Sequence, residues 1–582
     1  MTRYLVTSAL PYANGPIHFG HVVGAYLPAD VYVRTLRMQG EEVLYVCGTD
    51  EHGVAITIGA EKDGVPYPEY VAKWRAVIKD TFDRLGLAFD VWSGTSICPQ
   101  HAELSQEFFR RIDRNGYLLQ RETEQLYCTR DAMFLADRYV TGTCPSCAYP
   151  AARGDECPRC AKWLNPLDFV DPRCKVCGTQ PERRSTRHWY LDLPKVRDEF
   201  LGGWVQRHEW KPNVGAFVEN QMKEIEPRPI TRDMQWGVKL PSDTPGDVAG
   251  KVLYVWFDAP IGYVSFTREL AEKSGRPDDW KRWWQSEDTR LVHFIGKDNI
   301  PFHCVVFPAM LFATHSGYVL PWQVPANEFY NLQGRKFSTS AGWYIPLERF
   351  FERFDAQAAR FYLLASAPET KDSEWNWKDF QACNNAQLAD AIGNLVTRVL
   401  KFVAKNYQGT VPACDPAHEA ELDRFLLEHC GAFGDPGEHV RAFRFRRAAE
   451  QLVENARVAN VFVDRLAPWA LQKTDPARAA SVLSTCAEWI AYLARWMAPF
   501  MPEKAQAIWR MLGQSGEVAR SGWPALPRAG AWRIGLAGAK LGDVQGLFPK
   551  LADDVIAAEI ADLVGTVPGS TSTGSTRTAG PR

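Results

Sequence analysis

The sequence predicts an α/β protein with a doubly wound parallel sheet, followed by an all-α helical bundle. Two short β-rich apolar runs, residues 4–10 and 43–48, flank a helical pattern from about His18 to Met38, which is the strand–helix–strand order of a parallel sheet. From about residue 380 onward only helical periodicity remains. A polar segment rich in cysteine and proline separates two parts with similar strand-and-helix patterns.

The composition limits the functional class. The chain has 582 residues, 46% apolar and 23% charged, which is ordinary for a soluble protein of two to four domains. The formal net charge is −2, so any binding of nucleic acid must use local basic patches. The N-terminal residues do not resemble a signal peptide, and there is no apolar run of 18 residues. We therefore expect a cytoplasmic protein with no membrane segment and no disulfides.

The individual elements follow in chain order. The run 4–10 is read as a strand, PYANGP as a turn, and 18–38 as a helix with Val22, Tyr26, Ala29 and Val33 on one face. Further strands are expected at 252–258 and 291–296, with a helix at 299–315. Residues 390–405 and 445–466 read as amphipathic helices, whereas 567–582, rich in Gly, Ser, Thr and Pro, reads as disordered.

These patterns predict six segments. A Rossmann-type domain is expected in two halves, with the insertion between them and the helical domain after them. The expected ranges are 1–115 for the first half, 116–230 for the insertion, 231–325 for the second half, 326–380 for a connecting region, 381–550 for the helical domain and 551–582 for a largely disordered tail.

The insertion carries closely spaced cysteine pairs. Cys144, Cys147, Cys157 and Cys160 form two C-x-x-C knuckles separated by nine residues. Four thiolates in a tetrahedral arrangement suit Zn²⁺ and leave no open position, so this zinc would be structural. The alternative is four unpaired surface cysteines in a reducing compartment, which the spacing disfavours.

A second set surrounds the first in the sequence. Cys174 and Cys177 form a third knuckle, and Cys128 with Asp131 has the same spacing upstream. A carboxylate oxygen can replace one thiolate on zinc, so this outer set is a second candidate site. The sequence leaves open whether it holds a metal, because three thiolates and one carboxylate are an unusual set.

Polar residues follow the predicted strands at the edge where parallel sheets bind ligands. His18, Gly20 and His21 lie after the first strand at a helix N-terminus, a position that favours phosphate. Asp50 follows the second strand and Lys297 and Asp298 follow a later one. An HxGH motif alone is weak evidence for a phosphate site, because two histidines near a turn often have no functional role.

These motifs in combination resemble the class I methionyl-tRNA synthetase family. ALPYANGPIHFGH, YVWFDAPIGY, the knuckles and GRKFSTS (334–340) carry the resemblance over roughly residues 1–550. It implies ATP-dependent activation of L-methionine to methionyl-adenylate, followed by transfer to the 3′-terminal adenosine of tRNA(Met). It also implies a Rossmann domain with a zinc-knuckle insertion and a helical anticodon-binding domain. The absence of an appended module at the C-terminus leads us to expect a monomer.

The resemblance assigns roles to individual residues. ATP with Mg²⁺ would be bound by His18, Gly20, His21, Lys297, Asp298, Lys336, Ser338 and Thr339, with His18, His21 and Lys336 catalytic. Methionine would be held by Leu10, Tyr12, Asp50, Arg232, Trp256, Ala259, Pro260, Tyr263, Phe302, His303 and Phe307. The anticodon would be read by Asn394, Arg398 and Trp469. The alternative interpretation is that Asn394 and Arg398 form a solvated polar pair and that Trp469 packs in the core.

The sequence departs from the family in GRKFSTS. The family has a K-M-S-K-S loop there, and its second lysine is Thr339 in this chain, while Phe337 replaces the methionine. We expect Lys336, with help from Arg335, to supply the charge that Thr339 lacks.

Other functions predict features that this sequence lacks. Synthetases for Leu, Ile or Val would need a larger editing insertion, and one for Cys would need an open zinc site. A small HxGH nucleotidyltransferase would be shorter. A non-catalytic zinc-knuckle tRNA-binding protein predicts no ATP–pyrophosphate exchange, and exchange would therefore separate it from an enzyme.

Overall fold

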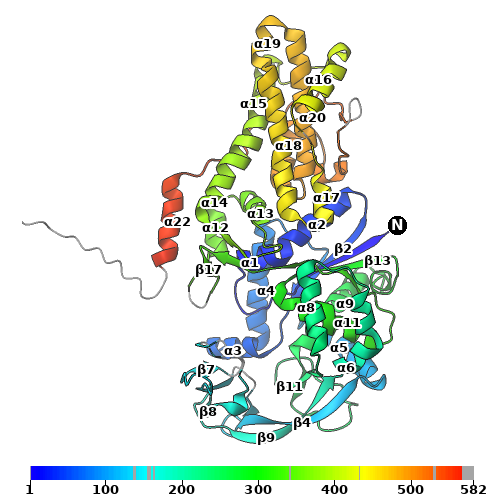
Figure 1. Ribbon diagram of the computed structural model, residues 1–582, viewed down its shortest axis with the longest axis vertical. Helices are drawn as coiled ribbons and strands as arrows, with labels where there is room; N and C mark the ends of the chain where they lie inside the picture. Colours follow the sequence, from blue (N-terminus) through cyan, green and yellow to red (C-terminus); the bar gives the residue numbers. More distant parts are fainter. Residues whose placement is uncertain are drawn as a thin grey trace, which may run out of the picture. The chain divides into compact units, whose positions relative to one another are not determined.

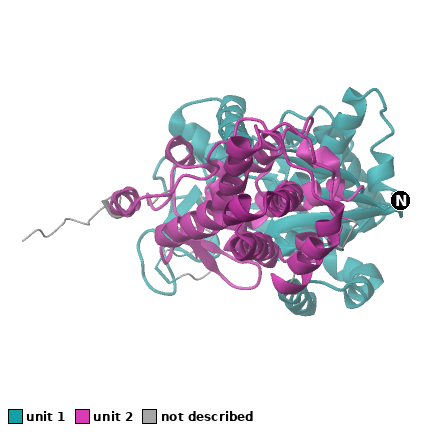
Figure 2. Cartoon of the chain, turned by 90° about the horizontal axis from the view of Figure 1, so that it is seen from above, with its two compact units in different colours: residues 1–17, 41–83, 88–326 teal, residues 18–40, 84–87, 327–582 magenta. Residues whose placement is uncertain are grey.

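The computed structural model describes residues 2–135, 139–153, 157, 159–160, 164–339, 342–431, 433–527 and 532–565. The chain divides into two compact units, coloured teal and magenta in Figure 2. Unit 1 contains residues 1–17, 41–83 and 88–326, and unit 2 contains residues 18–40, 84–87 and 327–582. The HFGH segment therefore groups with unit 2, although the strands before and after it in the sequence belong to unit 1.

Unit 1 is built on a parallel sheet. Its strands run in the order β14 (Pro321–Gln323), β13 (Thr289–Gly296), β1 (Arg3–Ser8), β2 (Glu42–Thr49) and β3 (Val91–Gly94). Leu5 in the central strand lies opposite Leu291 on one side and Leu44 on the other, and all three side chains are buried. The predicted doubly wound parallel sheet is confirmed, with strands from both halves of the sequence paired side by side.

In chain order, the helices of unit 1 alternate with the strands of its sheets. The longer ones are α3 (Val54–Asp63), α4 (Tyr67–Arg84), α5 (His101–Arg114), α8 (Pro212–Lys223), α9 (Val255–Lys273) and α11 (Phe307–Ala313). Short helical segments cover Leu193–Val196 (α6), Arg197–Leu201, Gly202–Gln206 (α7), Lys281–Trp284 (α10), Lys297–Asn299 and Phe302–Val306. The last of these, with α11, confirms the helix predicted at 299–315.

The strand predicted at 252–258 is wrong in its second half. Strand β12 (Lys251–Leu253) pairs with β11 (Thr231–Asp233), and helix α9 begins at Val255. The first turns of α9 bury Phe257, Asp258 and Ile261. A largely buried helix start has a continuous apolar run, which periodicity does not distinguish from a buried strand.

The cysteine-rich insertion forms its own strands. A long antiparallel ribbon joins β4 (Leu118–Cys128) to β9 (Glu182–Leu191), with β5 (Met133–Phe134) and β10 (Arg228–Pro229) at its edges. A small sheet of β7 (Ala152–Arg153), β6 (Val140–Thr143) and β8 (Val170–Cys174) carries the knuckles, and a short 3-10 turn spans Pro166–Asp168. These strands are the cyan part of Figure 1.

Unit 2 begins with the helix predicted at 18–38. It consists of α1 (Phe19–His21), a π-helical stretch Val22–Tyr26 and α2 (Leu27–Met38). A small sheet of β17 (Arg335–Lys336), β16 (Tyr330–Leu332) and β18 (Ser373–Trp375) follows much later in the chain. Helices α12 (Leu347–Arg353), α13 (Ala356–Ala365) and α14 (Trp377–Ala382) accompany that sheet.

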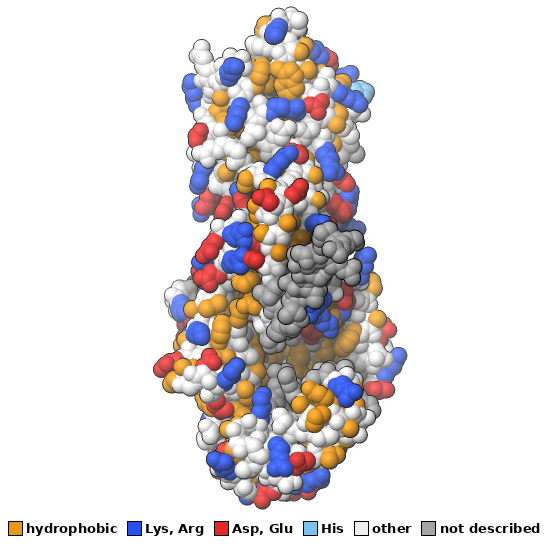
Figure 3. Space-filling model, turned by 90° about the vertical axis from the view of Figure 1, so that its left-hand side faces the viewer, with side chains coloured by type: hydrophobic (Ala, Val, Ile, Leu, Met, Phe, Trp, Pro, Cys, Tyr) orange, Lys and Arg blue, Asp and Glu red, His pale blue; other side chains and the backbone are white. Residues whose placement is uncertain are grey.

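The rest of unit 2 is helical, as predicted. A π-helical stretch Cys383–Gly393 leads into α15 (Asn394–Asn406), and α18 (Phe445–Leu466) matches the helix predicted at 445–466. The other helices are α16 (Pro416–His429), α17 (Pro436–Arg441), α19 (Pro468–Thr474), α20 (Pro476–Met497), α21 (Pro502–Met511) and a 3-10 turn Val518–Ser521. In Figure 3 the upper part, formed by these helices, carries lysine and arginine side chains interspersed with acidic ones.

The predicted tail is helical in part. Residues Asp553–Gly565 form α22, so the prediction of a largely disordered 551–582 is wrong for this stretch. Ile556 and Leu563 are buried, and Glu559 and Asp562 form ion pairs with Arg353 and Arg349. The disorder predicted for 567–582 lies outside the described residues. Within the described ranges, no helix is both long and apolar enough to cross a membrane.

Candidate functional site

A cavity of about 110 Å³ opens in unit 1 at the carboxyl end of the sheet. Most of the residues predicted to hold methionine line it: Leu10, Asp50, Trp256, Ala259, Pro260, Tyr263, Phe302 and His303. Ala9, Val255 and Asn299 complete the wall, and the sequence reasoning missed them although each is adjacent in the chain to a predicted residue or lies in the same turn. The lining is mostly apolar and aromatic, with one carboxylate, one imidazole and one amide.

Three predicted methionine residues do not line this cavity. Tyr12 forms a backbone bridge with Asp50, and Phe307 packs behind the wall with its ring 6.1 Å from that of Tyr263. Arg232 lies on β11, with its guanidinium 3.9 Å from the ring centre of Tyr254. Tyr254 in turn lies 5.4 Å, ring centre to ring centre, from Trp256, the exposed indole at the cavity rim.

The backbone around Asp50 is tightly held. Its N–H donates to the carbonyl of Pro11 (3.0 Å), and its carbonyl accepts from Ala13 (2.9 Å). The next residue, Glu51, is fully buried and accepts from Thr49 (2.6 Å), as well as from Arg75 and Ser96. These contacts fix the backbone at Asp50, which lines the cavity.

The carboxylate of Asp50 lies in a desolvated position near two other carboxylates. Burial, together with the carboxylates of Asp258 and Glu51, raises the pKa of Asp50 well above its ordinary value. The N–H of His52 donates to Oδ1 at 3.3 Å and opposes that rise. A cation in the cavity beside Asp50 would favour the ionised carboxylate.

A buried network lies behind Asp50. Asp258 Oδ2 is 2.6 Å from His52 Nδ1 and 3.5 Å from His101 Nε2, and all three side chains are buried. Burial alone would raise the pKa of Asp258, but His52 and His101 hold it below its ordinary value. Ser265 lies 3.0 Å from His101 Nδ1 and completes the chain of contacts. His52, His101 and Asp258 are residue types that can bind a metal ion, but the hydrogen bonds among them already explain why they lie together.

The opposite wall has a second hydrogen-bonded pair. Tyr263 Oη is 2.9 Å from His303 Nε2, and His303 Nδ1 is 3.0 Å from the carbonyl of Asn299. Burial lowers the pKa of His303 to about 4, so its ring is neutral at pH 7. Because a carbonyl only accepts, Nδ1 carries the proton and the hydroxyl of Tyr263 donates to Nε2. Lys297 and Asp298 follow β13 in a 3-10 turn and do not line the cavity.

The HFGH motif in unit 2 forms a compact cap on α1. The N–H of Gly20 donates to His18 Nδ1, and the N–H of His18 donates to His21 Nδ1, both at 3.1 Å. A Cβ on Gly20 would lie 2.9 Å from the His18 ring and 3.2 Å from the carbonyl of Tyr330, so the position requires glycine. The capping function of these two histidines was not predicted.

These hydrogen bonds determine the tautomers of both histidines. Desolvation by the surrounding protein and the neighbouring His21 lower the pKa of His18 to about 2, and desolvation lowers that of His21 to about 4. Each neutral ring accepts a backbone N–H at Nδ1 and so carries its proton at Nε2. The motif therefore presents two N–H donors.

The GRKFSTS stretch packs onto this motif within unit 2. The Phe337 ring stacks on His18 at 4.4 Å with an interplanar angle of 7°. Lys336 ends strand β17 with its ammonium 5.0 Å from the ring centre of Phe329. Ser338 exchanges two backbone hydrogen bonds with Trp343, both 2.9 Å, and Thr339 is exposed in the turn between them. Ser340 lies outside the described residues.

The inner cysteine set converges in unit 1. The Sγ atoms of Cys144 and Cys160 are 3.9 Å apart, and those of Cys147 and Cys157 are 3.6 Å apart. Zinc–sulfur bonds of about 2.3 Å in a tetrahedron place sulfurs roughly 3.8 Å apart. The four thiols therefore fit one zinc ion.

The outer set also converges. Asp131 Oδ2 lies 3.2 Å from both Cys128 Sγ and Cys174 Sγ, and Cys128 Sγ is 3.4 Å from Cys177 Sγ. All four donor atoms lie within 4.8 Å of one another. Thr179 Oγ1, 2.9 Å from Cys177 Sγ, is a neighbour that the sequence reasoning did not identify.

The residues predicted to read an anticodon lie on helices of unit 2. Arg398 on α15 has its guanidinium 4.8 Å from the ring centre of Trp469 on α19, and it donates to Asp464 at 2.9 Å. Asn394, one turn before Arg398, is exposed. The structure brings an arginine and a tryptophan together at the end of the bundle.

Two family models match the chain. The model described as tRNA synthetases class I (M) covers residues 4–400, and the anticodon binding domain of methionyl tRNA ligase covers residues 416–566.

Individual relatives extend over almost the whole chain. Methionine–tRNA ligases of Parabacteroides distasonis and Porphyromonas gingivalis are 42% and 43% identical, over 97% of this chain and 81% of their own length. A solved structure of Mycobacterium tuberculosis methionyl-tRNA synthetase in complex with methionyl-adenylate is 25% identical, with a TM-score of 0.72, over 94% of this chain and 100% of that one.

Proposed function

The chain belongs to the methionine–tRNA ligase family, and we propose that the cavity beside Asp50 is where this ATP-dependent enzyme activates L-methionine. The family reaction forms methionyl-adenylate and then methionyl-tRNA. The observation that carries the site assignment is a small apolar cavity with a single carboxylate at the carboxyl edge of the parallel sheet.

Asp50 is the proposed partner of the methionine ammonium group. Its anchored backbone presents the carboxylate to the cavity, and burial together with the neighbouring carboxylates of Asp258 and Glu51 raises its pKa. Binding of the ammonium would lower that pKa and hold the pair ionised. His52 and Asp258, behind Asp50, are positioning residues in this scheme.

The aromatic wall is the proposed thioether pocket. Trp256 and Phe302 meet edge to face, with ring centres 4.3 Å apart, and Tyr263 and His303 form the hydrogen-bonded opposite side. A polarisable sulfur makes favourable contacts with aromatic edges. Leu10, Ala259 and Pro260 fill the remaining wall, while Tyr12, Phe307 and Arg232 support it from outside the cavity.

Activation needs charge stabilisation on phosphate. The methionine carboxylate attacks the α-phosphorus of ATP, a new C–O–P link forms, and pyrophosphate leaves with the electron pair of the broken P–O bond. The Nε2–H groups of His18 and His21 are the proposed donors to phosphate oxygens, beside the close backbone approach that Gly20 allows. Lys297, Asp298, Ser338 and Thr339 are proposed ATP contacts, and Mg²⁺ would accompany the substrate.

The second step requires tRNA(Met). A hydroxyl of its 3′-terminal adenosine attacks the methionyl carbonyl and AMP leaves. Trp469 is the proposed stacking surface for an anticodon base, and Asn394 and Arg398 the proposed donors to base edges. To reach a base, Arg398 would exchange its ion pair with the exposed Asp464.

The cysteine sets are proposed structural zinc sites. The inner four thiolates would hold one ion with no open position, and the outer set would hold a second through three thiolates and Asp131. Zinc thiolates require a reducing compartment, which supports a cytoplasmic location. We further propose that the enzyme acts as a monomer.

The decisive experiment is amino-acid-dependent ATP–pyrophosphate exchange with purified protein. Methionine should support exchange far better than leucine, isoleucine or cysteine, and Asp50→Asn should raise KM for methionine at least tenfold. Preferential exchange with another amino acid, or none with methionine, would contradict the proposal.

A further inference from the structure

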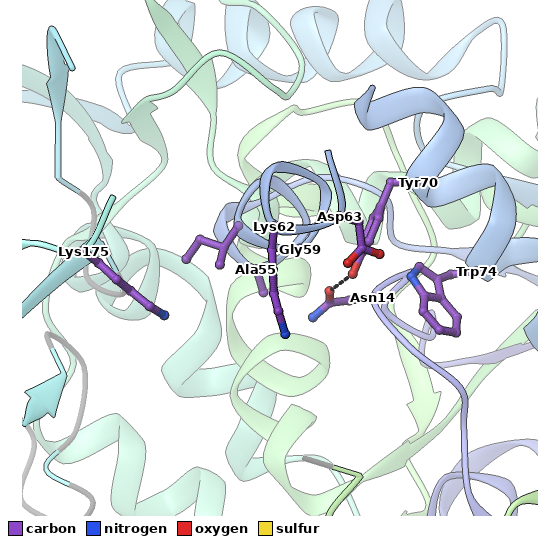
Figure 4. Close-up of a pocket in the computed structure, with 9 residues that line it drawn as sticks. Asn14, Ala55, Gly59, Lys62, Asp63, Tyr70, Trp74 and Lys175 are labelled. Atoms are coloured by element: carbon purple, nitrogen blue, oxygen red, sulfur yellow. Dashed lines mark hydrogen bonds between the residues drawn. The ribbon is translucent and has the colours of Figure 1, made fainter. Parts of the chain in front are cut away.

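Unit 1 holds polar side chains both in an open pocket and in a sealed layer. Figure 4 shows the open pocket, of about 330 Å³, where Tyr70 donates to Asn14 at 2.9 Å beside the exposed Lys62. Polar groups in such a pocket can hydrogen-bond to water. The sealed layer joins strands β1 and β13 to the wall of the proposed methionine cavity, and its polar groups need partners within the protein.

Two fully buried side chains form the centre of the sealed layer. Thr7 in β1 and His293 in β13 are register partners in the parallel sheet, and Thr7 Oγ1 lies 2.5 Å from His293 Nδ1. The ring centre of His293 is 5.4 Å from that of Tyr263 and 5.0 Å from that of His303, the hydrogen-bonded pair of the cavity wall. Neither Thr7 nor His293 lines the cavity, so they can act on a bound amino acid only through that wall.

The hydrogen bonds of this layer run in one direction. His303 Nδ1 donates to the carbonyl of Asn299, so the Tyr263 hydroxyl gives its hydrogen to His303 Nε2. Burial raises the pKa of Tyr263 well above its ordinary value, and a hydrogen bond with the Thr7 side chain opposes that rise. Because the hydrogen of Tyr263 is already used, Thr7 donates in that bond, and its oxygen accepts from the Nδ1–H of His293.

The other ring nitrogen of His293 makes no comparable contact. Its Nε2 is buried and has no hydrogen-bond partner among the described residues. Burial and the neighbouring His303 lower the pKa of His293 well below its ordinary value, so the ring is neutral and Nε2 is a bare acceptor. An apolar ring at this position would need no partner at all. What a histidine contributes here is therefore the Nδ1–H that it donates to Thr7.

We propose that Thr7 and His293 are positioning residues of the methionine site, which together with His303 fix the Tyr263 phenol against the cavity. A phenol held by two hydrogen bonds keeps the width of the aromatic pocket constant. A constant width matters most for a side chain that fills the pocket, so it favours methionine over homocysteine, which lacks the terminal methyl group. This inference rests on the proposed function for the identity of the amino acid.

The first test compares Thr7→Val, which keeps the shape of threonine, with Thr7→Ser, which keeps its hydroxyl. ATP–pyrophosphate exchange is measured with methionine and with homocysteine. Thr7→Val should raise KM for methionine about tenfold, leave kcat within about twofold of wild type and narrow the preference for methionine about fivefold. Thr7→Ser should stay close to wild type. A merely structural role would lower kcat equally for both amino acids, leave KM and the preference unchanged, and overturn the proposal.

The second test asks whether the effect passes through the Tyr263 hydroxyl. His293→Phe keeps an aromatic ring but removes the Nδ1–H, so it should raise KM for methionine as Thr7→Val does. The two effects should not add, and neither variant should raise KM further in a Tyr263→Phe background. Thr35→Val, which removes a buried threonine hydroxyl from α2 in unit 2, is the matched control and should leave KM unchanged.

Two results would contradict the inference. Wild-type KM and preference in both Thr7→Val and His293→Phe would show that the layer does not position the wall. Equal increases in KM with and without the Tyr263 hydroxyl would show that these residues act through another contact. Absence of methionine-dependent exchange in wild type would count against the proposed function instead.

Discussion

At the scale of single residues, the phosphate-facing chemistry depends on which atoms carry protons. His18 and His21 each use Nδ1 to accept a backbone N–H of their own helix start, so each holds its proton at Nε2. Their lowered pKa values keep both rings neutral across the physiological range. Because both histidines are neutral donors, a positive charge on the phosphates must come from another residue. Lys336 is the proposed source, because Thr339 carries no charge.

Lys336→Ala should lower the rate of ATP–pyrophosphate exchange by about 100-fold, because a charge that acts on the transition state is lost. The KM for methionine should change little. Lys378→Ala, an exposed lysine elsewhere in unit 2, should leave exchange at the wild-type rate. A normal rate for Lys336→Ala would assign the charge to another group.

At the scale of elements, helix ends place side chains that are far apart in the sequence. α15 and α19 bring Arg398 and Trp469 within 4.8 Å, and Pro468 begins α19 where Ala467 has a left-handed φ of 40°. This sharp turn sets the indole beside the guanidinium. An aromatic and a planar cation together suit an unstacked base.

Trp469→Ala should raise KM for tRNA(Met) in aminoacylation about tenfold, through loss of stacking on one base. Trp469→Phe should be close to wild type. Methionine-dependent exchange should be unaffected in both, because it does not involve tRNA. If Trp469→Ala leaves aminoacylation unchanged, the residue is only a packing anchor.

At the scale of unit 2, one buried arginine joins distant segments of the chain. Arg360 is fully buried and donates to Asp30 (2.7 Å) and to the carbonyls of Leu85, Pro499 and Phe500 (2.9 Å each). Burial alone would raise the pKa of Asp30, but the charges of Arg34 and Arg360 hold it below its ordinary value. Because the buried guanidinium of Arg360 donates to all four of these acceptors, shortening its side chain would leave them without that donor.

Arg360→Met should lower the free energy of unfolding of unit 2 by about 3 kcal/mol or more, because it leaves Asp30 and three carbonyls short of a donor. Arg34→Ala, on the half-exposed partner, should cost less. Denaturant titration followed by tryptophan fluorescence measures both.

The cost of Arg360→Met should also depend on pH. A depressed carboxyl pKa contributes stability above its unfolded value of about 3.9 and loses it as the pH falls through the folded value. The difference between wild type and Arg360→Met should therefore be largest near neutrality and shrink below about pH 4. A difference independent of pH would show that Asp30 does not contribute through its charge.

The sequence by itself determined the parallel sheet, the helical domain and the two cysteine sets, because each depends on short-range periodicity or spacing. Its motifs also carried the resemblance to one family. Only the tertiary structure decided where α9 begins, that Asp553–Gly565 is helical, which proposed methionine residues line the cavity, and which histidine nitrogens carry protons. The cavity lining depends on contacts between residues far apart in the chain, and the proton positions of His18 and His21 depend on the backbone geometry at the start of α1. The GRKFSTS stretch illustrates both kinds of information. Its difference from the family loop at Thr339 is visible in the sequence, whereas the stacking of Phe337 on His18 is visible only in the structure.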